Sequence, residues 1–133
     1  MRMIFVNLPV SDRDRADTFY GALGFRRDDQ FSDDRCVSYV VEENIVVMLL
    51  TRERFADFVT GQVGDPAQAT SVLNCLSAGS REEVDRLVQA AITAGGKPWL
   101  PAQDSGSMYG ASFADPDGNV WEVMWMDPAV LQG

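Results

Sequence analysis

The chain has 133 residues, of which 46% are hydrophobic and 23% are charged, as in an ordinary globular protein large enough to bury a core. Its net charge of −9 and isoelectric point near 4.3 argue against nucleic acid or anionic membranes as partners, because their recognition needs clustered Lys and Arg. No apolar run is long enough for a signal peptide or a membrane span, and Cys36 and Cys75 lie in strand-like runs without a CxxC pattern. We therefore expect a cytoplasmic protein with two buried, reduced thiols.

The first half of the chain predicts a strand, a helix and three more strands. Residues 3–10 alternate as in a strand, with an aliphatic face toward the helix and Phe5 and Asn7 on the opposite face. Ser11 is placed to cap the helix that follows, whose apolar stripe faces the sheet until Gly24 ends it. Further strands are expected at residues 25–31, 36–41 and 45–50, with a short helix after the last of them.

The second half of the chain repeats this order. A strand is expected at residues 71–78, and Ser80-Arg81-Glu82-Glu83 has the Ser-x-x-Glu spacing of a capping box before a helix that Gly95-Gly96 ends. Strands follow at residues 97–100, 108–113 and 120–126. The internal repeat predicts one domain, with a first module at about residues 1–60, a linker at about 61–69 and a second module at about 70–133.

Matching the two halves residue by residue predicts which side chains share an inner surface. Phe5-Val6-Asn7-Leu8 matches Val72-Leu73-Asn74-Cys75, and Asn44-Ile45-Val46-Val47 matches Asn119-Val120-Trp121-Glu122. The predicted fold class is α+β, with two βαβββ modules forming a curved mixed sheet around a cleft. The expected apolar walls of the cleft are Phe5, Val47, Leu49, Val72 and Met124, and its expected polar groups are Asn7, Asn74 and Glu122.

Glu122 is the residue most directly tied to function. It follows the turn Asp115-Pro116-Asp117-Gly118, in a strand that is otherwise apolar on both faces. A carboxylate in such a place needs a partner, a cation or a proton. Two interpretations stay open: Glu122 contacts a ligand or acts as a general base, or it is satisfied internally by an asparagine or a water.

Three other residues have both a functional and a structural interpretation. Asn7 and Asn74 either orient a carbonyl or amide group of a ligand, or form hydrogen bonds to the backbone where the modules join. Tyr109 either closes over a ligand or packs on its own loop. The three tryptophans are expected in the core rather than in an aromatic cage.

These residues and motifs resemble the vicinal oxygen chelate superfamily, which contains glyoxalase I, bleomycin-resistance proteins and extradiol dioxygenases. The resemblance covers nearly the whole chain and depends on Phe19-Tyr20, Leu23-Gly24-Phe25 and the run from Phe113 to Glu122. It implies a homodimer, in some members with modules exchanged between chains, and a site in the cleft between paired modules.

The resemblance also implies where a divalent metal would bind. The metal-ligand positions of the family's enzymes correspond here to Phe5, Val47, Val72 and Glu122, of which only Glu122 has a donor atom. The chain contains no histidine, which excludes the iron oxygenase triad and any imidazole zinc site. We therefore expect no tightly bound metal cofactor, and at most a weak Mg²⁺ or Mn²⁺ site at Glu122.

The resulting functional hypothesis is metal-independent binding of a small organic molecule in a cleft centred on Glu122, with a cationic or polar ligand favoured by the acidic charge of the chain. The alternative is a lyase-, isomerase- or dioxygenase-like enzyme that uses Glu122 as a base or as a weak divalent-metal ligand. A structural dimer with a filled cleft is the third hypothesis.

Overall fold

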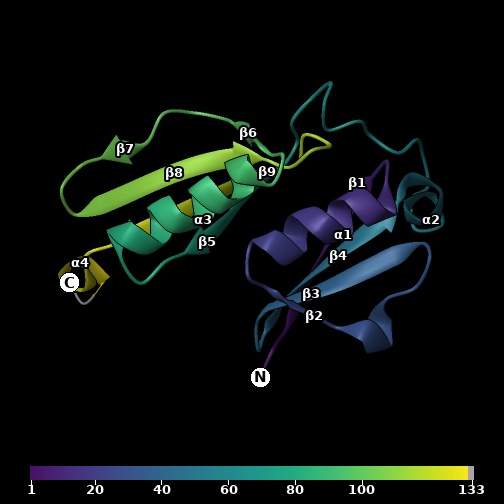
Figure 1. Ribbon diagram of the computed structural model, residues 1–133, viewed down its shortest axis with the longest axis horizontal. Helices are drawn as coiled ribbons and strands as arrows, with labels where there is room; N and C mark the ends of the chain where they lie inside the picture. The colour runs from purple at the N-terminus through teal and green to yellow at the C-terminus, as the bar shows by residue number, and fades with distance from the viewer. Residues whose placement is uncertain (132–133) are drawn as a thin grey trace. The chain divides into compact units, whose positions relative to one another are not determined.

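The computed structural model describes residues 1–131 and divides the chain into two compact units, Met1–Asp65 and the part from Pro66 onward (Figure 1). The boundary falls inside the segment expected to be a linker. Each unit consists of an open mixed sheet and a covering helix, so the predicted α+β class is confirmed. Within residues 1–131, no helix has both the length and the apolar character needed to cross a bilayer.

The first unit follows the predicted order, with one short 3-10 helix, η1, added. Its elements are β1 (Ile4–Val10), α1 (Arg13–Ala22), β2 (Arg26–Arg27), η1 (Asp29–Phe31), β3 (Cys36–Glu42), β4 (Ile45–Thr51) and α2 (Arg52–Ala56). The sheet order is β1-β4-β3-β2, with β1 parallel to β4 and the other neighbours antiparallel.

Two details of the first unit differ from the sequence prediction. The helix cap is Asp12 rather than Ser11, because Asp12 Oδ1 accepts the backbone N–H groups of Asp14 and Arg15 at 3.0 and 3.1 Å. The strand expected at residues 25–31 keeps only two residues. Beyond them, the Asp28 carboxylate accepts the N–H of Gln30 and starts η1, a local hydrogen bond that competes with strand pairing.

The core of the first unit lies between α1 and its sheet. Phe19 and Tyr20 on α1 are fully buried, as are Val47 and Leu49 on β4. The Tyr39 hydroxyl donates to the backbone carbonyl and the carboxylate of Asp17, at 2.8 and 2.5 Å, and so ties α1 to β3. The apolar stripe predicted for this helix therefore packs on the sheet as expected.

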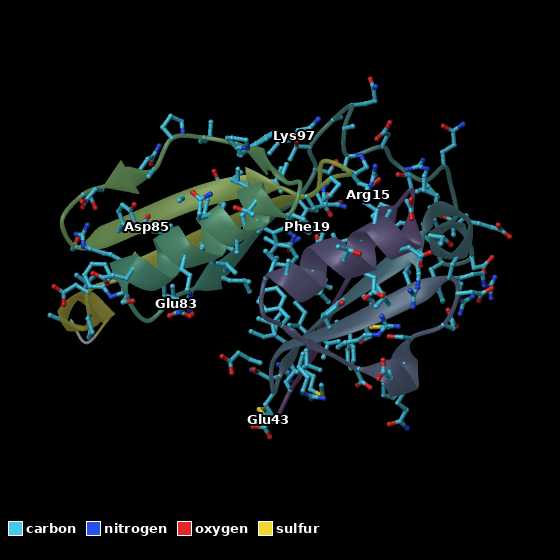
Figure 2. All side chains as sticks on the ribbon, viewed as in Figure 1. Arg15, Phe19, Glu43, Glu83, Asp85 and Lys97 are labelled. Carbon is cyan, nitrogen blue, oxygen red and sulfur yellow. The ribbon has the colours of Figure 1, made fainter. Side chains whose placement is uncertain are left out.

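The second unit also follows the predicted order, with one strand and one terminal helix added. Its elements are β5 (Leu73–Ser77), α3 (Arg81–Thr93), β6 (Lys97–Pro98), β7 (Gln103–Asp104), β8 (Met108–Ala114), β9 (Val120–Met126) and α4 (Pro128–Leu131). The sheet order is β5-β9-β8-β6, and β7 pairs with β8. At the start of α3, where Figure 2 labels Glu83, Ser80 Oγ accepts the N–H of Glu83 at 3.1 Å, while the Glu83 carboxylate accepts the N–H of Gly79 at 2.6 Å.

The turn before β9 is organised by one buried carboxylate. Asp115 is 1% exposed, and its Oδ1 accepts the N–H groups of Asp117 and Asn119 at 2.9 and 2.8 Å. The Asn119 amide donates to Asp115 Oδ2 at 2.9 Å, and Gly118 closes the turn with a φ of 99°. These contacts fix the start of β9 and so determine which face of the sheet Glu122 occupies.

Candidate small-molecule site

The open face of the second sheet is the face that α3 leaves uncovered. Tyr109 and Trp125 mark the covered face, since the guanidinium of Arg81 on α3 lies 5.3 and 5.0 Å from their ring centroids. Side chains alternate along β8 and β9, so Glu122 and Met124 lie on the open face. The same face carries Cys75, Met108 and Ser112.

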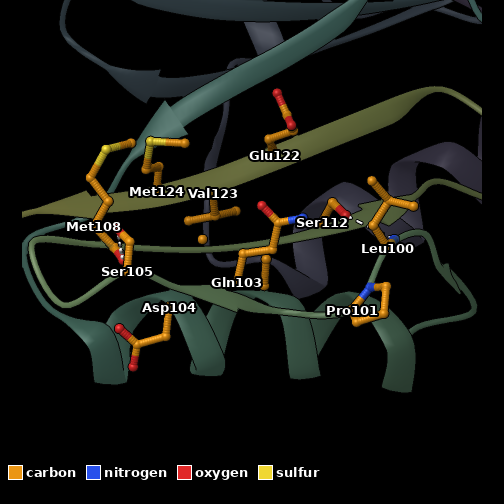
Figure 3. Close-up of a pocket in the computed structure, with 12 residues that line it drawn as sticks. Leu100, Pro101, Gln103, Asp104, Ser105, Met108, Ser112, Glu122, Val123 and Met124 are labelled. Atoms are coloured by element: carbon orange, nitrogen blue, oxygen red, sulfur yellow. Dashed lines mark hydrogen bonds between the residues drawn. The ribbon is translucent and has the colours of Figure 1, made fainter.

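A recess of about 370 Å³ lies over this open face (Figure 3). Its lining residues come from segments 100–105, 108–112 and 122–124, all within the second unit. The lining is mainly apolar, and its polar side chains include Glu122, Gln103 and Ser112. The volume lies in the lower part of the range usual for ligand pockets, about 300–1,000 Å³.

Two side chains, Ser112 and Arg81, hold the 100–106 segment that forms the outer wall. Ser112 Oγ accepts the backbone N–H of Leu100 at 3.0 Å. Farther along, the Arg81 guanidinium pairs with Asp104 at 2.5 Å and donates to the Gly106 carbonyl at 2.8 Å. The hydrogen bond from Arg81 holds the pKa of the Asp104 carboxyl below its usual value.

Glu122 lies between two neutral side chains of the open face. Ser112 is opposite it on β8 and Cys75 is opposite it on β5. Within residues 1–131, the half-buried carboxylate of Glu122 makes no hydrogen bond or ion pair. Burial, and then the negative charge of Glu122, raise the pKa of the Cys75 thiol. Cys75 is exposed, which corrects the expectation that both cysteines are buried.

Tyr109 does not face the recess. Its hydroxyl donates to the Asp85 carboxylate of α3 at 2.5 Å, a bond that raises the pKa of Tyr109. Tyr109 therefore does not line this recess. Of its two interpretations, the structural one describes its position better, although its partner is the helix rather than its own loop.

The first sheet places two predicted wall residues on its covered face. Val47 and Leu49 are 0% exposed and lie opposite Tyr39 and Val37 beneath α1, so the expectation that they line an open surface is wrong. The parallel register explains this, because Val47 and Leu49 lie beside Val6 and Leu8 on the aliphatic face of β1, the face expected to lie toward the helix.

The open face of the first sheet carries the neighbouring positions instead. Phe5 and Asn7 are on it as predicted, opposite Val46 and Met48 of β4. The Asn7 amide donates to the Phe5 carbonyl at 3.1 Å, a local bond within β1 rather than the predicted bond to the backbone where the modules join.

The sequence comparison of the two halves matched Asn7 with Asn74. In the structure, the residue of the second unit that corresponds to Asn7 is Cys75, one position later. Asn74 pairs with Trp121 and so lies on the covered face, whereas Cys75 pairs with Glu122. In the structure, Asn7 and Cys75 each lie five residues before the N-cap of their unit. The sequence did not show this, because the expected cap Ser11 lies four residues after Asn7. Val72 precedes β5 and is 58% exposed.

The sequence analysis missed Gln103, Met108 and Ser112. Ser112 could have been found by pairing strands outward from the turn at residues 115–118, since it lies directly opposite Glu122. Gln103 had no signal, because β7 is a two-residue strand inside a segment that reads as a loop.

The sequence profile of the Glyoxalase/Bleomycin resistance protein/Dioxygenase superfamily matches residues 2–123. A solved hypothetical protein from S. aureus, SA1046, is 27% identical with a TM-score of 0.79, and 94% of each chain is covered. A glyoxalase-related enzyme from Fulvimarina pelagi is 21% identical with a TM-score of 0.79, over 94% of this chain and 88% of that one. A lactoylglutathione lyase from Agrobacterium tumefaciens is 19% identical with a TM-score of 0.66, over 92% of both chains.

No curated protein sequence matches the chain. The family profile spans most of the residues, and the solved structures share the arrangement of strands and helices. The chain belongs to the glyoxalase/bleomycin resistance protein/dioxygenase superfamily.

The donor atoms of this chain do not fit the divalent metal that the resemblance implies. Phe5, Val47 and Val72 have no donor side chain, and Met48 and Leu73, their neighbours in sequence on the open faces, offer no carboxylate or imidazole. In the part of the chain that the structure describes, no group of three or more His, Cys, Asp and Glu side chains is placed to hold a metal ion.

Proposed function

We propose that this protein binds a small organic molecule in the recess centred on Glu122, without a divalent metal. The observation that carries the proposal is a half-buried carboxylate, with no hydrogen-bond or ion-pair partner within residues 1–131, in a mainly apolar recess of about 370 Å³. Apolar walls with a few convergent polar groups are the usual composition of a ligand site. The walls proposed are Met108 and Met124 from the sheet and Leu100 and Pro101 from the outer segment.

Metal independence is proposed from the donor set. A transition metal in a protein is held by three or four side chains, and here Glu122 is the carboxylate on the open face of β9. A hard cation such as Mg²⁺ keeps several of its own waters, so a weak site at Glu122 is the strongest metal site that these residues support.

The six methionines provide a direct assay. In protein labelled with ¹³C at the methionine methyls, a panel of cationic antibiotics and small metabolites is screened in the presence of chelator. We expect the strongest binders to shift the methyl signals of Met108 and Met124, and we expect that response to weaken at least about tenfold in Glu122→Ala. Glu82→Ala, an exposed carboxylate on α3, is the matched control.

If no compound moves the Met108 and Met124 signals, or if Glu122→Ala binds the panel as the unchanged protein does, the recess is not the binding site. Binding that moves only methyls outside the recess would have the same meaning.

An enzymatic use of the same carboxylate is the second candidate. Glu122 has no hydrogen-bond or ion-pair partner among the described residues, and it borders a recess. A general base in an enzyme without bound substrate has the same surroundings. Glu122→Gln keeps the shape of the side chain but cannot accept a proton at neutral pH. Unchanged turnover in that variant, for any reaction that the protein is found to catalyse, would remove the base mechanism.

We further infer that the protein works as a cytoplasmic homodimer. The homodimer is an inference from family membership, and the cytoplasmic location follows from the two free cysteines. Sedimentation of the purified protein tests the dimer, and a monomer at micromolar concentration would contradict it.

A further inference from the structure

The charges around the recess suggest the class of its ligand, an inference that rests on the proposed function. The lining contains two carboxylates, Asp104 and Glu122, and no Lys or Arg. The charge of a ligand therefore depends on which of these carboxylates is available to it.

The Asp104 carboxylate already has a partner on the covered side of the sheet. In the register of β7 and β8 it lies opposite Tyr109, on the covered side of the sheet, and Figure 3 shows its carboxylate turned away from Glu122. There it pairs with Arg81 at 2.5 Å and accepts the N–H of Gly106 at 2.9 Å. One negative charge, that of Glu122, is left facing the recess.

A ligand that covers Glu122 also removes its water. Because an ionised carboxylate is costly to desolvate without a partner, the ligand has to supply a positive charge or hydrogen-bond donors at this point. The neighbouring side chains Ser112 and Cys75 are neutral, and Ser112 Oγ already accepts the N–H of Leu100. An organic cation satisfies Glu122 most completely, and the net charge of −9 raises the local concentration of cations.

The apolar part of the recess has a distinctive composition. Met108 and Met124 lie at one end of the lining and Leu100 and Pro101 at the other, with Gln103 and Ser112 between them (Figure 3). Thioether sulfur makes favourable contacts with aromatic rings at a separation of about 5 Å, and methionine adapts to the shape of what it covers. The two methionines therefore offer a surface suited to an aromatic ring, and Leu100 and Pro101 add apolar surface at the other end of the lining.

We propose that the ligand is a singly charged organic cation with an aromatic body, whose positive group pairs with Glu122 and whose ring packs on Met108 and Met124. Leu100 and Pro101 supply further apolar lining. Arg81 sets the charge preference indirectly, because it neutralises the second carboxylate.

The test uses probes that differ in charge alone or in ring type alone. The charge series is 1-naphthylmethylamine, 1-naphthylmethanol and 1-naphthoate, and the ring series is benzylamine and cyclohexylmethylamine. Dissociation constants come from the ¹³C methyl shifts of Met108 and Met124. We expect the naphthyl amine to bind at least about tenfold more tightly than the alcohol, and the naphthoate to bind most weakly.

The variants assign each preference to a residue. Glu122→Gln is expected to bring the amine-to-alcohol ratio close to one with little change in alcohol binding, whereas Glu82→Gln retains the ratio. Met124→Leu keeps the apolar contact but removes the sulfur, so benzylamine is expected to lose about threefold in affinity relative to cyclohexylmethylamine. Met3→Leu, an exposed methionine of the first unit, is the control.

Equal binding of the amine and the alcohol would overturn the charge assignment, although shifts at Met108 and Met124 would leave the proposed function standing. 1,4-Bis(aminomethyl)benzene has two equivalent amino groups, which alone make its binding about twofold tighter than that of benzylamine. If it binds more tightly than this factor explains, the proposal that the ligand carries a single charge is wrong. If none of these probes shifts the two methyls, the inference fails, and the wider compound panel then decides the proposed function separately.

Discussion

Gly118 shows how a single residue determines the geometry of the site from outside it. Its φ of 99° lies in the left-handed region, and a Cβ at this position would approach the backbone of Ala67 and Pro66 to 2.9 Å. Only glycine meets both requirements. The turn begins at the buried Asp115, and β9 starts two residues after Gly118. This glycine therefore helps to set the position of Glu122.

We predict that Gly118→Ala lowers the free energy of unfolding by about 2 kcal/mol or more, because the left-handed backbone and the contact with Ala67 are both penalised. The urea midpoint of the purified variant measures the change. Gly64→Ala is the control, since a Cβ there meets nothing within 4 Å. If the two variants have equal midpoints, the description of this turn is wrong.

At the scale of the elements, each covering helix is fastened to its sheet by a polar network as well as by apolar packing. On α1, Asp17 accepts the Tyr39 hydroxyl and the guanidinium groups of Arg27 and Arg13. Burial alone would raise the pKa of Asp17, but the Tyr39 hydrogen bond and the arginine contacts outweigh burial and lower it. The folded state therefore favours the ionised form.

The pH dependence of stability follows from the lowered pKa of Asp17. A carboxyl whose pKa is depressed on folding contributes stability above its unfolded value, near 3.8, and loses it as the pH falls through the folded value. We predict that Asp17→Asn lowers the free energy of unfolding at pH 7 by about 1–2 kcal/mol. The difference between variant and unchanged protein should shrink progressively below pH 3.8.

Urea unfolding from pH 7 to pH 2.5 measures this difference. Asp34→Asn, an exposed carboxyl in the loop before β3, is expected to change stability little at any pH. The prediction would be contradicted if the difference in the free energy of unfolding between Asp17→Asn and the unchanged protein stayed constant down to pH 2.5.

On α3, Arg81 fastens the outer wall of the recess. It pairs with Asp104, donates to the Gly106 carbonyl and stacks over Tyr109 and Trp125. We predict that Arg81→Met leaves the global free energy of unfolding within about 1 kcal/mol, because an exposed ion pair contributes little. The backbone amides of residues 100–106 should nevertheless exchange with solvent several times faster.

Hydrogen exchange followed by mass spectrometry checks the mobility of this segment. Arg86→Met on the same helix is the control, since its side chain is exposed. Unchanged exchange in segment 100–106 of Arg81→Met would show that Ser112 and strand pairing hold the wall without Arg81.

At the scale of the whole molecule, the sequence predicted the repeated order of elements well. The reason is that a capping residue and a stripe of apolar residues indicate each covering helix. Thr51 and Ser80 cap helices in the structure, and Gly24 and Gly95 follow helices with positive φ. What the sequence could not give was the face of every strand. The residue-by-residue match of the two halves was one residue out in both places, since Val47 lies beneath α1 beside Val6, and Cys75 rather than Asn74 lies on the open face of β5.

The recess was foreseen only in part for the same reason. Glu122 and Met124 were placed correctly, because the turn before them is encoded strongly by Asp115 and Gly118. The outer wall was not foreseen, since Gln103 and Leu100 lie in a segment whose position depends on tertiary contacts with Arg81 and Ser112. Side-chain chemistry alone predicted the carboxylate at the centre of the proposed site, whereas the proposed outer wall depends on packing between segments distant in sequence.

The measurement that most directly tests a site working without a metal is the melting temperature of the protein and of Glu122→Ala, after chelator treatment and with Mg²⁺, Mn²⁺, Zn²⁺, Ni²⁺ or Fe²⁺ added. A cation present at about 100 times its dissociation constant would add about 2.7 kcal/mol, which corresponds to a rise of several degrees. We predict that no cation raises the melting temperature of the unchanged protein by more than it raises that of Glu122→Ala. A rise of several degrees that Glu122→Ala abolishes would contradict this account and would make Glu122 a metal ligand.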